Sequence, residues 1–335
     1  MPKAFHNSMA DAGGAIVIAG ARGYIGSALA RHLAARGRAL RLVSRSREEP
    51  IIAKGPAPVE YVQADLRNVD NWRRLMDGAD AIIHLSSRTD LRAAEADPSG
   101  DDAINVDPAR ALATAAQRSG FTPKVVFAST VTIVGTQHGN PVNEHTPDRP
   151  CSIYDRHKLA CEAIFLEATK AGLLKSCSLR LPNVYGPGAS VNLNRGILNI
   201  MMRRALNGEP LTLYGKGSYV RDFIYLDDVV EAFAAAVDAD VCDGSHYVIA
   251  TGRGHTLGDA YRLVAEEAFA ATGRRAEIVN VPEPADLYPI ERRNFIGDSS
   301  LFRQRAGWRP TIALQDGIRR FMAAASAAHT MAAGE

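Results

Sequence analysis

The chain has 335 residues, of which 46% are hydrophobic and 23% are charged, and its formal net charge is +2. This composition is typical of a soluble globular protein large enough for two lobes. The near-neutral charge argues against bulk attraction to nucleic acid or to a membrane, and no apolar run has the length that spans a bilayer. No two of the four cysteines have the Cys-x-x-Cys spacing of metal and redox sites. We therefore expect no metal and a cytoplasmic location, since the N-terminus also lacks the apolar core of a signal peptide.

Apolar runs alternate with helical patterns in the first half of the chain. The apolar runs predict strands at 15–19, 40–44, 59–64, 81–85, 125–129 and 178–181. Helical spacing predicts helices at 25–35, 69–77, 102–119 and 154–171. Repetition of strand, helix and strand indicates an α/β fold, in which a doubly wound parallel sheet carries helices on both faces.

The pattern changes after Pro182, where a loop rich in glycine and proline begins. Helices are predicted near 195–207 and 227–238, and strands at 211–214 and 246–250. This mixture indicates a smaller α+β lobe, while the segment 227–250 fits a helix and a strand that return to the main sheet. The expected domains are a larger one at 14–182 plus about 222–252, and the smaller lobe at about 183–221 and 253–325. We expect residues 1–13 to form a tail, and residues 323–335 to form a fraying helix or tail.

A glycine-rich loop joins the first predicted strand to the first predicted helix, with the sequence Gly20-Ala-Arg-Gly23-Tyr-Ile-Gly26. In such a loop one glycine allows the tight turn, one lets the backbone approach a pyrophosphate, and one lets the helix pack close to the strand. The N–H groups and the dipole of the helix N-terminus then attract the phosphates. The loop therefore predicts a dinucleotide site.

The end of the second strand indicates which dinucleotide is used. An NAD site usually has an acidic residue there, which binds the ribose hydroxyls. This chain instead has Val43-Ser44-Arg45-Ser46-Arg47, and a guanidinium can pair with a phosphate in bidentate fashion. We expect NADPH, with Arg45 on the 2′-phosphate and Ser44 assisting. The alternative interpretation is a solvated basic loop.

A tyrosine and a lysine share one face of the helix predicted at 154–171, in the sequence Tyr154-Asp-Arg-His-Lys158. Free tyrosine has a pKa near 10, and lowering it by ~3 takes ~4 kcal/mol, which a nearby ammonium and an oxidised nicotinamide could supply in a dry site. In a reduction, Tyr154 would donate its proton to a carbonyl oxygen that Thr130 holds by a hydrogen bond. Lys158 would also anchor the cofactor ribose. We expect His157 to point off this face into solvent, and His84 to be a satisfied core histidine.

These motifs, in this order, resemble the extended short-chain dehydrogenase/reductase family, which contains nucleotide-sugar epimerases, dehydratases and ketoreductases. The resemblance covers about residues 14–320 and implies a Rossmann fold. It also implies a homodimer formed through two helices of each subunit, one of them 154–171. The expected cofactor contacts are Gly20, Gly23, Tyr24, Ile25, Gly26, Ser44, Arg45, Asp65, Leu66, Leu85, Ser86, Ser87, Asn105, Tyr154, Lys158 and Leu181.

The second lobe also resembles this family, which implies a nucleotide-diphosphate sugar as substrate. Asn183 lies in a loop similar to one whose asparagine meets the sugar nucleotide. Arg221-Asp-Phe-Ile-Tyr225 resembles a segment whose arginine binds the diphosphate, and Arg293 lies near the place of a second such arginine. The expected substrate contacts are Arg88, Thr130, Asn183, Arg221 and Arg293.

Departures from the family pattern narrow the expected reaction. Dehydratases carry Asp-Glu after the catalytic threonine, whereas Val131-Thr132 follow Thr130 here, so elimination lacks its acid–base pair. The segment 203–212 and the stretch around Trp308 resemble 4-ketoreductases of antibiotic deoxysugar pathways. We therefore expect NADPH-dependent reduction of a nucleotide-linked, dTDP-type 4-keto-6-deoxysugar. The alternatives are a nucleotide-sugar 4-epimerase with tightly bound NAD and a non-catalytic sensor that binds NADPH.

Overall fold

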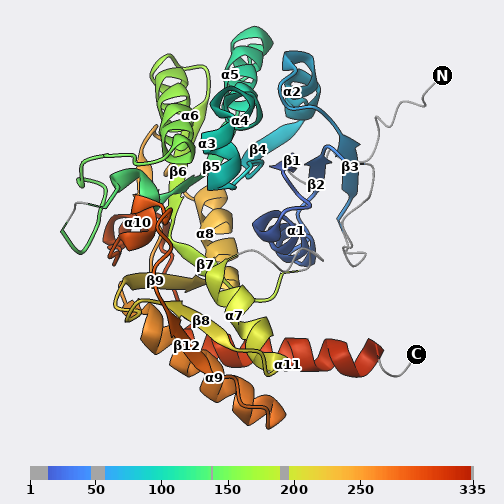
Figure 1. Ribbon diagram of the computed structural model, residues 1–335. Coiled ribbons are helices and arrows are strands. Elements are labelled where there is room, and N and C mark those ends of the chain that lie inside the picture. Colours follow the sequence, from blue (N-terminus) through green and yellow to red (C-terminus); the bar gives the residue numbers. More distant parts are fainter. Residues whose placement is uncertain (1–13, 47–56, 137–138, 189–195, 333–335) are drawn as a thin grey trace. The chain divides into compact units, whose positions relative to one another are not determined.

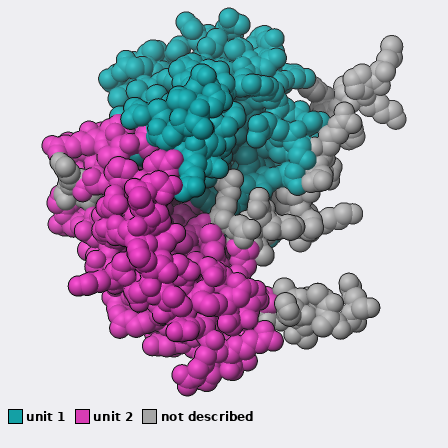
Figure 2. All heavy atoms as spheres, in the orientation of Figure 1, with its two compact units in different colours: residues 1–129, 153–179, 233–246 teal, residues 130–152, 180–232, 247–335 magenta. Residues whose placement is uncertain are grey.

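The structure is a computed structural model that describes residues 14–46, 57–136, 139–188 and 196–332 (Figure 1). The tail predicted at 1–13 lies outside these residues. The chain divides into two compact units (Figure 2). Unit 1 comprises Met1–Ser129, Ile153–Leu179 and Phe233–His246, and unit 2 comprises Thr130–Ser152, Arg180–Ala232 and Tyr247–Glu335.

The main sheet has seven strands in the order β10-β6-β5-β4-β1-β2-β3. Its strands are β1 (Ala15–Ala19), β2 (Leu40–Ser44), β3 (Val59–Gln63), β4 (Ala79–His84), β5 (Lys124–Thr130), β6 (Lys175–Leu181) and β10 (His246–Val248). The pairs β2/β3, β1/β2, β1/β4 and β4/β5 are parallel, which confirms the predicted parallel sheet. The strand order reverses between β1 and β4, and doubly wound sheets bind ligands beyond the carboxyl ends of the strands at such a point.

Helices cover both faces of the part of this sheet that lies in unit 1 (Figure 1). They are α1 (Tyr24–Ala35), α2 (Val69–Met76), α3 (Leu91–Ala96), α4 (Pro98–Asn105), α5 (Asp107–Ser119) and α6 (Ile153–Lys170). On one face α2 packs against α5, and α5 packs against α6. These helices share a buried core with Val17 of β1, Ile82 of β4 and Phe127 of β5. The helix α1 lies on the other face.

The single helix predicted at 102–119 is wrong, because the chain forms α4 and α5 there with Val106 between them. Pro108 lies in the first turn of α5. A proline has no N–H to donate and its ring clashes with the preceding turn, so it is tolerated at a helix start but not inside one. Pro108 therefore explains the break at Val106, which the helical spacing of apolar residues does not predict.

Unit 2 mixes short strands with packed helices. Its strands are β7 (Asn183–Tyr185), β8 (Leu211–Tyr214), β9 (Val220–Tyr225), β11 (Gly254–Thr256) and β12 (Ile278–Val281). The order β11-β9-β7 makes one sheet, and β8 and β12 make a parallel pair. The helices are η1 (Val131–Val134), α7 (Ile197–Leu206), α9 (Leu257–Thr272), η2 (Pro289–Arg292), α10 (Ser300–Ala306) and α11 (Leu314–Ala332). The long helices α7, α9 and α11 pack on one another around Leu198, Val264 and Ile318.

One further helix, α8 (Leu226–Asp238), leads from the residues of unit 2 into those of unit 1. The strand β10 follows it and pairs with β6 at the end of the main sheet, as predicted for the segment 227–250. In the described part of the chain, no helix has both the length and the apolar character needed to cross a membrane.

Candidate functional site

The glycine-rich loop after β1 has the close backbone approaches that its glycines predict. Gly20 has φ +90°, and a Cβ there would lie 2.8 Å from the backbone N of Ser86. A Cβ on Gly26 would lie 2.2 Å from the carbonyl oxygen of Gly20, so α1 could not pack this closely with a larger residue. The N-cap residue of α1 is Gly23, which has no side chain to accept a hydrogen bond from the first N–H groups of the helix. The first turn of α1 also contains no acidic residue. This helix start therefore fits an anionic group such as a pyrophosphate.

The end of β2 presents the residues that we expected to select the dinucleotide. The Ser44 hydroxyl donates to the carbonyl of Ser46 at 2.8 Å, and Gln63 donates to the carbonyl of Arg45 at 3.0 Å. The Arg45 side chain is exposed. Close to this strand end, Arg67 holds the Asp65 carboxylate through Nη2–Oδ2 at 2.6 Å, and this bond lowers the pKa of Asp65 to about 2.

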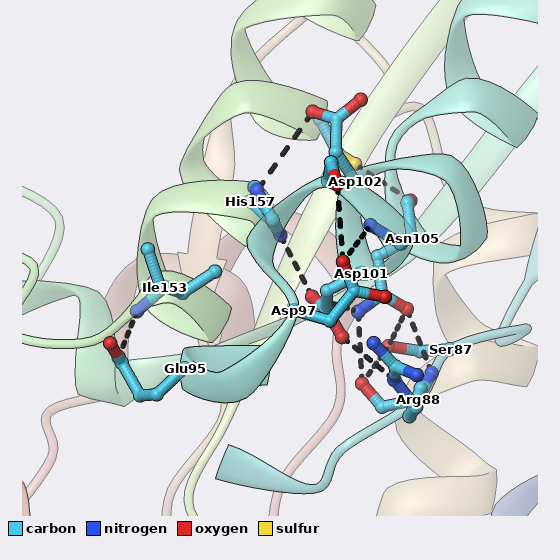
Figure 3. A network of polar contacts seen from close by, with 12 residues as sticks. Ser87, Arg88, Glu95, Asp97, Asp101, Asp102, Asn105, Ile153 and His157 are labelled. Carbon is cyan, nitrogen blue, oxygen red and sulfur yellow. Dashed lines mark hydrogen bonds and ion pairs between the residues drawn. The ribbon is translucent and has the colours of Figure 1, made fainter. Parts of the chain in front are cut away.

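Asn105 at the end of α4 holds the loop that follows β4 (Figure 3). Its Oδ1 accepts from the backbone N of Arg88 at 2.7 Å and from the Ser87 hydroxyl at 3.0 Å. Its Nδ2 donates to the carbonyl of Arg88 at 2.9 Å and to the carboxylate of Asp101 at 2.8 Å. The predicted Ser87 and Asn105 are therefore brought together, and the Arg88 backbone lies between them.

The Asp101 carboxylate is fully buried and receives three donors. Besides Asn105, they are Arg88 Nε at 2.9 Å and His157 Nδ1 at 2.8 Å. Figure 3 shows His157 lying between Asp101 and Asp102. The expectation that His157 is solvated is wrong, since only 14% of its side chain is exposed.

The start of α6 carries the predicted catalytic pair. Lys158 is buried, its Nζ lies 5.8 Å from the centre of the Tyr154 ring, and it donates to the carbonyl of Ala128 at 2.8 Å. Burial lowers the pKa of Lys158 to about 8. The Glu95 carboxylate accepts from the backbone N of Ile153 at 2.7 Å, which satisfies a free donor of the first turn (Figure 3).

His84 at the end of β4 is in the core, but it is not satisfied as we expected. Neither ring nitrogen has a hydrogen-bond partner within the described residues. The ring packs against Trp72 at 5.7 Å and Phe127 at 5.6 Å between ring centres. Burial, and after it the charge of Lys158, lowers the pKa of His84 to about 3. His84 therefore acts as a neutral, aromatic-like packing residue.

Thr130 ends β5 and belongs to unit 2, whereas Tyr154 belongs to unit 1. Thr130 is the N-cap of η1, and its hydroxyl accepts from the backbone N of Thr132 at 3.2 Å. The two threonine hydroxyls also lie 2.8 Å apart. These bonds fix the orientation of the Thr130 hydroxyl.

Unit 2 brings the predicted Asn183, Arg221 and Arg293 together. Arg293 Nη2 donates to Asn183 Oδ1 at 3.0 Å, and Arg221 donates to the backbone carbonyls of Arg293 and Glu291. Both arginines are buried. Burial first, and then the charge of Arg293, lowers the pKa of Arg221 to about 9. Two adjacent guanidinium groups are suited to a ligand with two negative charges.

The sequence did not predict three acidic residues, Asp101, Glu162 and Glu291, which lie close to predicted site residues along a helix or in space. Asp101 lies one helical turn before Asn105, so an inward Asn105 places Asp101 inward as well. Glu162 follows Lys158 by one turn in the same way, and its carboxylate accepts from the Ser129 hydroxyl. Glu291 lies 70 residues from Arg221 in the sequence, and no local pattern predicts their ion pair. Among the residues described, no group of three His, Cys, Asp or Glu side chains could hold a metal ion.

Known proteins similar to this chain cover nearly all of it. A UDP-glucose 4-epimerase of Mycolicibacterium smegmatis is 29% identical over 91% of this chain and 96% of its own length. A dTDP-L-rhamnose 4-epimerase of Burkholderia thailandensis is 27% identical over 90% of this chain and 92% of its own. The solved UDP-glucose 4-epimerase of Thermotoga maritima with UDP-glucose is 25% identical, with a TM-score of 0.82 over 94% of this chain and 99% of that one.

A second solved structure is similar in sequence as well as in fold. The UDP-glucose 4-epimerase of Thermus thermophilus in complex with NAD is 29% identical, with a TM-score of 0.75 over 92% of this chain and 97% of that one. The model of the family described as "NAD dependent epimerase/dehydratase family" matches residues 16–250. With most of its length matched and the parallel sheet in place, this chain belongs to the NAD dependent epimerase/dehydratase family.

Proposed function

We propose that this chain is a nucleotide-sugar 4-epimerase that keeps a tightly bound nicotinamide dinucleotide. One observation favours epimerisation over net reduction: a UDP-glucose 4-epimerase and a dTDP-L-rhamnose 4-epimerase, at 29% and 27% identity, match about nine tenths of the chain. The geometry agrees with this proposal at two places. The uncapped start of α1 suits a pyrophosphate, and the buried Arg221 and Arg293 suit the diphosphate of a nucleotide sugar.

In the proposed reaction, the dinucleotide would be held by the glycine loop Gly20–Gly26 and by Lys158, and it would supply reversible oxidation and reduction at C4 of the sugar. Tyr154 would act as the base that accepts the proton of the C4 hydroxyl, and later as the acid that returns it. The Lys158 ammonium would favour the Tyr154 phenolate by its charge and hold the cofactor ribose. Thr130, whose hydroxyl is already oriented by Thr132, would hold the C4 oxygen.

Substrate would be bound chiefly through its diphosphate. Arg221 and Arg293 would pair with the phosphate oxygens, and Asn183, which accepts from Arg293, would hold that guanidinium in place. The sugar must present both faces of C4 in turn to the same nicotinamide. Anchoring at the diphosphate, away from the reacting carbon, leaves the sugar free to rotate.

A second candidate is an NADPH-dependent 4-ketoreductase acting on a nucleotide-linked 4-keto-6-deoxysugar. The observation that favours it is the end of β2, where Ser44 and the exposed Arg45 stand in the place of the acidic residue that is usual in an NAD site. An arginine at this place suits a 2′-phosphate better than free ribose hydroxyls. In this reaction Tyr154 would only donate a proton, and the cofactor would be consumed.

The cofactor of the purified protein separates the two candidates. We expect NAD to be retained through purification, and UDP-glucose and UDP-galactose, or a dTDP-sugar pair, to interconvert without net consumption of cofactor. Protein purified free of nucleotide, with NADPH bound about tenfold more tightly than NADH (~1.4 kcal/mol), and turnover of a 4-ketosugar would establish the reductase instead. Binding of cofactor without turnover of either substrate class would leave the non-catalytic sensor. A Tyr154→Phe protein of unchanged activity would contradict the mechanism in both reactions.

A further inference from the structure

The two buried arginines of unit 2 are held by neutral acceptors. Arg221 Nη2 donates to the Glu291 carbonyl at 2.5 Å, and Arg221 Nη1 donates to the Arg293 carbonyl. Arg293 Nη1 donates to the Ile290 carbonyl at 2.9 Å. A carbonyl oxygen satisfies a donor but does not cancel its charge. These bonds therefore fix both guanidinium groups in place and leave their positive charge for an anion.

The carboxylate of Glu291 faces both of these guanidinium groups. Its Oε2 lies 3.8 Å from Arg221 Nη2 and 4.0 Å from Arg293 Nη1. Both distances permit ionic attraction but exceed the length of a hydrogen bond. The Glu291 side chain is 45% exposed, whereas the Arg221 side chain is 2% exposed. The backbone of Glu291 is thus anchored in η2, while its carboxylate can move into solvent at little cost.

We propose that the Glu291 carboxylate is a built-in competitor of the substrate diphosphate, an inference that rests on the proposed function. Both anions use the same two cations, so the carboxylate must move aside when a nucleotide sugar binds. Two guanidinium groups balance the two charges of a diphosphate, and Glu291 adds a third negative charge beside them. This charge weakens the binding of substrate and product alike, and it speeds the release of product. It also disfavours any anion that cannot contact both arginines at once.

Removing this charge while keeping the shape of the side chain tests the inference. We would measure the binding of UDP and UDP-glucose to the cofactor-loaded protein by calorimetry, for the wild type and for Glu291→Gln. We expect Glu291→Gln to bind UDP about fivefold more tightly (~1 kcal/mol), a modest effect because the carboxylate is partly exposed. The difference should shrink in 0.5 M salt, because added ions screen the removed charge.

The matched control is Glu209→Gln. Glu209 lies in the same unit, its side chain is 50% exposed, and its Oε2 is 3.6 Å from Arg204 Nε. This substitution removes an equal charge from a comparable ion pair, and we expect UDP binding to be unchanged. Glu291→Ala serves as a second variant that also removes the charge, with the fold of each protein checked by circular dichroism.

Each outcome decides between failure of the inference and failure of the proposed function. Tighter UDP binding by the Glu291 variants alone supports the competitor. Equal or weaker binding by a folded Glu291→Gln protein overturns it, because a carboxylate that merely supports the loop would give that result. If the wild type binds neither UDP nor dTDP at millimolar concentration, the diphosphate site itself is absent, and the proposed function fails together with the inference.

Discussion

His84 illustrates how a buried histidine can make folding depend on pH. Its ring lies among Trp72, Phe127 and Phe165, and its nitrogens have no hydrogen-bond partner in the part of the chain that is described. Burial lowers the pKa of His84 to about 3, whereas the unfolded residue titrates near 6.5. Between these values the unfolded state binds a proton that the folded state does not. The free energy of unfolding therefore falls as the pH falls below about 6.5.

We predict that His84→Leu removes this part of the pH dependence. The wild type should lose about 2 kcal/mol of stability from His84 between pH 7.5 and pH 5, because a pKa difference of one corresponds to 1.36 kcal/mol. Leucine is apolar and close in size to histidine, so it keeps the packing without the titration. Urea unfolding at several pH values would measure this difference. Parallel stability curves for the two proteins would contradict the assignment.

The Lys158 ammonium is in the opposite situation, since it is buried but has a partner. Its Nζ donates to the Ala128 carbonyl at 2.8 Å and lies 4.7 Å from the centre of the Phe127 ring. Burial nevertheless lowers the pKa of Lys158 to about 8. A lysine poised near physiological pH is well placed to modulate the charge of a neighbouring phenol.

Three elements of unit 1 meet at the Asp101 carboxylate. It accepts from Arg88 in the loop after β4, from Asn105 in its own helix α4, and from His157 in α6 (Figure 3). The start of α6 carries Tyr154, and the loop after β4 carries the predicted cofactor contacts. A single buried carboxylate thus sets the position of α6 relative to that loop.

We predict that Asp101→Asn destabilises the protein by about 2–4 kcal/mol, because it removes the acceptor of a buried charged pair and places an amide donor against donors. The matched control is Asp102→Asn at the next residue, whose side chain is 32% exposed and pairs with Arg110. Its loss should cost under about 1 kcal/mol. Urea unfolding would compare the two variants. An Asp101→Asn protein no less stable than Asp102→Asn would show that the network carries little stability.

Across the whole chain, most predicted cofactor contacts lie in unit 1 and most predicted substrate contacts lie in unit 2; the exceptions are Leu181 and Arg88. The glycine loop Gly20–Gly26 and the pair Tyr154 and Lys158 belong to unit 1. The arginines Arg221 and Arg293 and the predicted Asn183 belong to unit 2. If the proposed function holds, the dinucleotide and the diphosphate should each stabilise mainly the unit that carries their contacts.

We predict that hydrogen exchange separates these two effects. Adding the dinucleotide to cofactor-free protein should slow amide exchange around residues 20–26, since the N–H groups at the start of α1 gain phosphate partners. Adding UDP should slow exchange around residues 220–225 and 289–293. A UDP effect confined to the segments of unit 1 would contradict the placement of the diphosphate at Arg221 and Arg293.

Local patterns in the sequence determined the parallel sheet, the glycine loop and the shared face of Tyr154 and Lys158. They could do so because strand alternation, helical spacing and the steric needs of a tight turn depend on residues close together in the chain. The break at Val106 could also have been predicted locally, since Pro108 is tolerated at a helix start but not inside a helix. No local pattern of this kind distinguishes reduction from epimerisation. The sequence motifs favoured reduction, whereas the similarity to known 4-epimerases favours epimerisation.

Only the tertiary structure decided which charged side chains from distant parts of the chain face one another. His157 faces Asp101 because α4 and α6 pack together, and Glu291 faces Arg221 and Arg293 because η2 folds against β9. Neither pair has a sequence signal, since the residues that meet are set by the packing of elements far apart in the chain. The His84 nitrogens, which have no hydrogen-bond partner among the residues that the structure describes, have the same origin. A strand pattern predicts that a residue is buried but not which atoms will surround it.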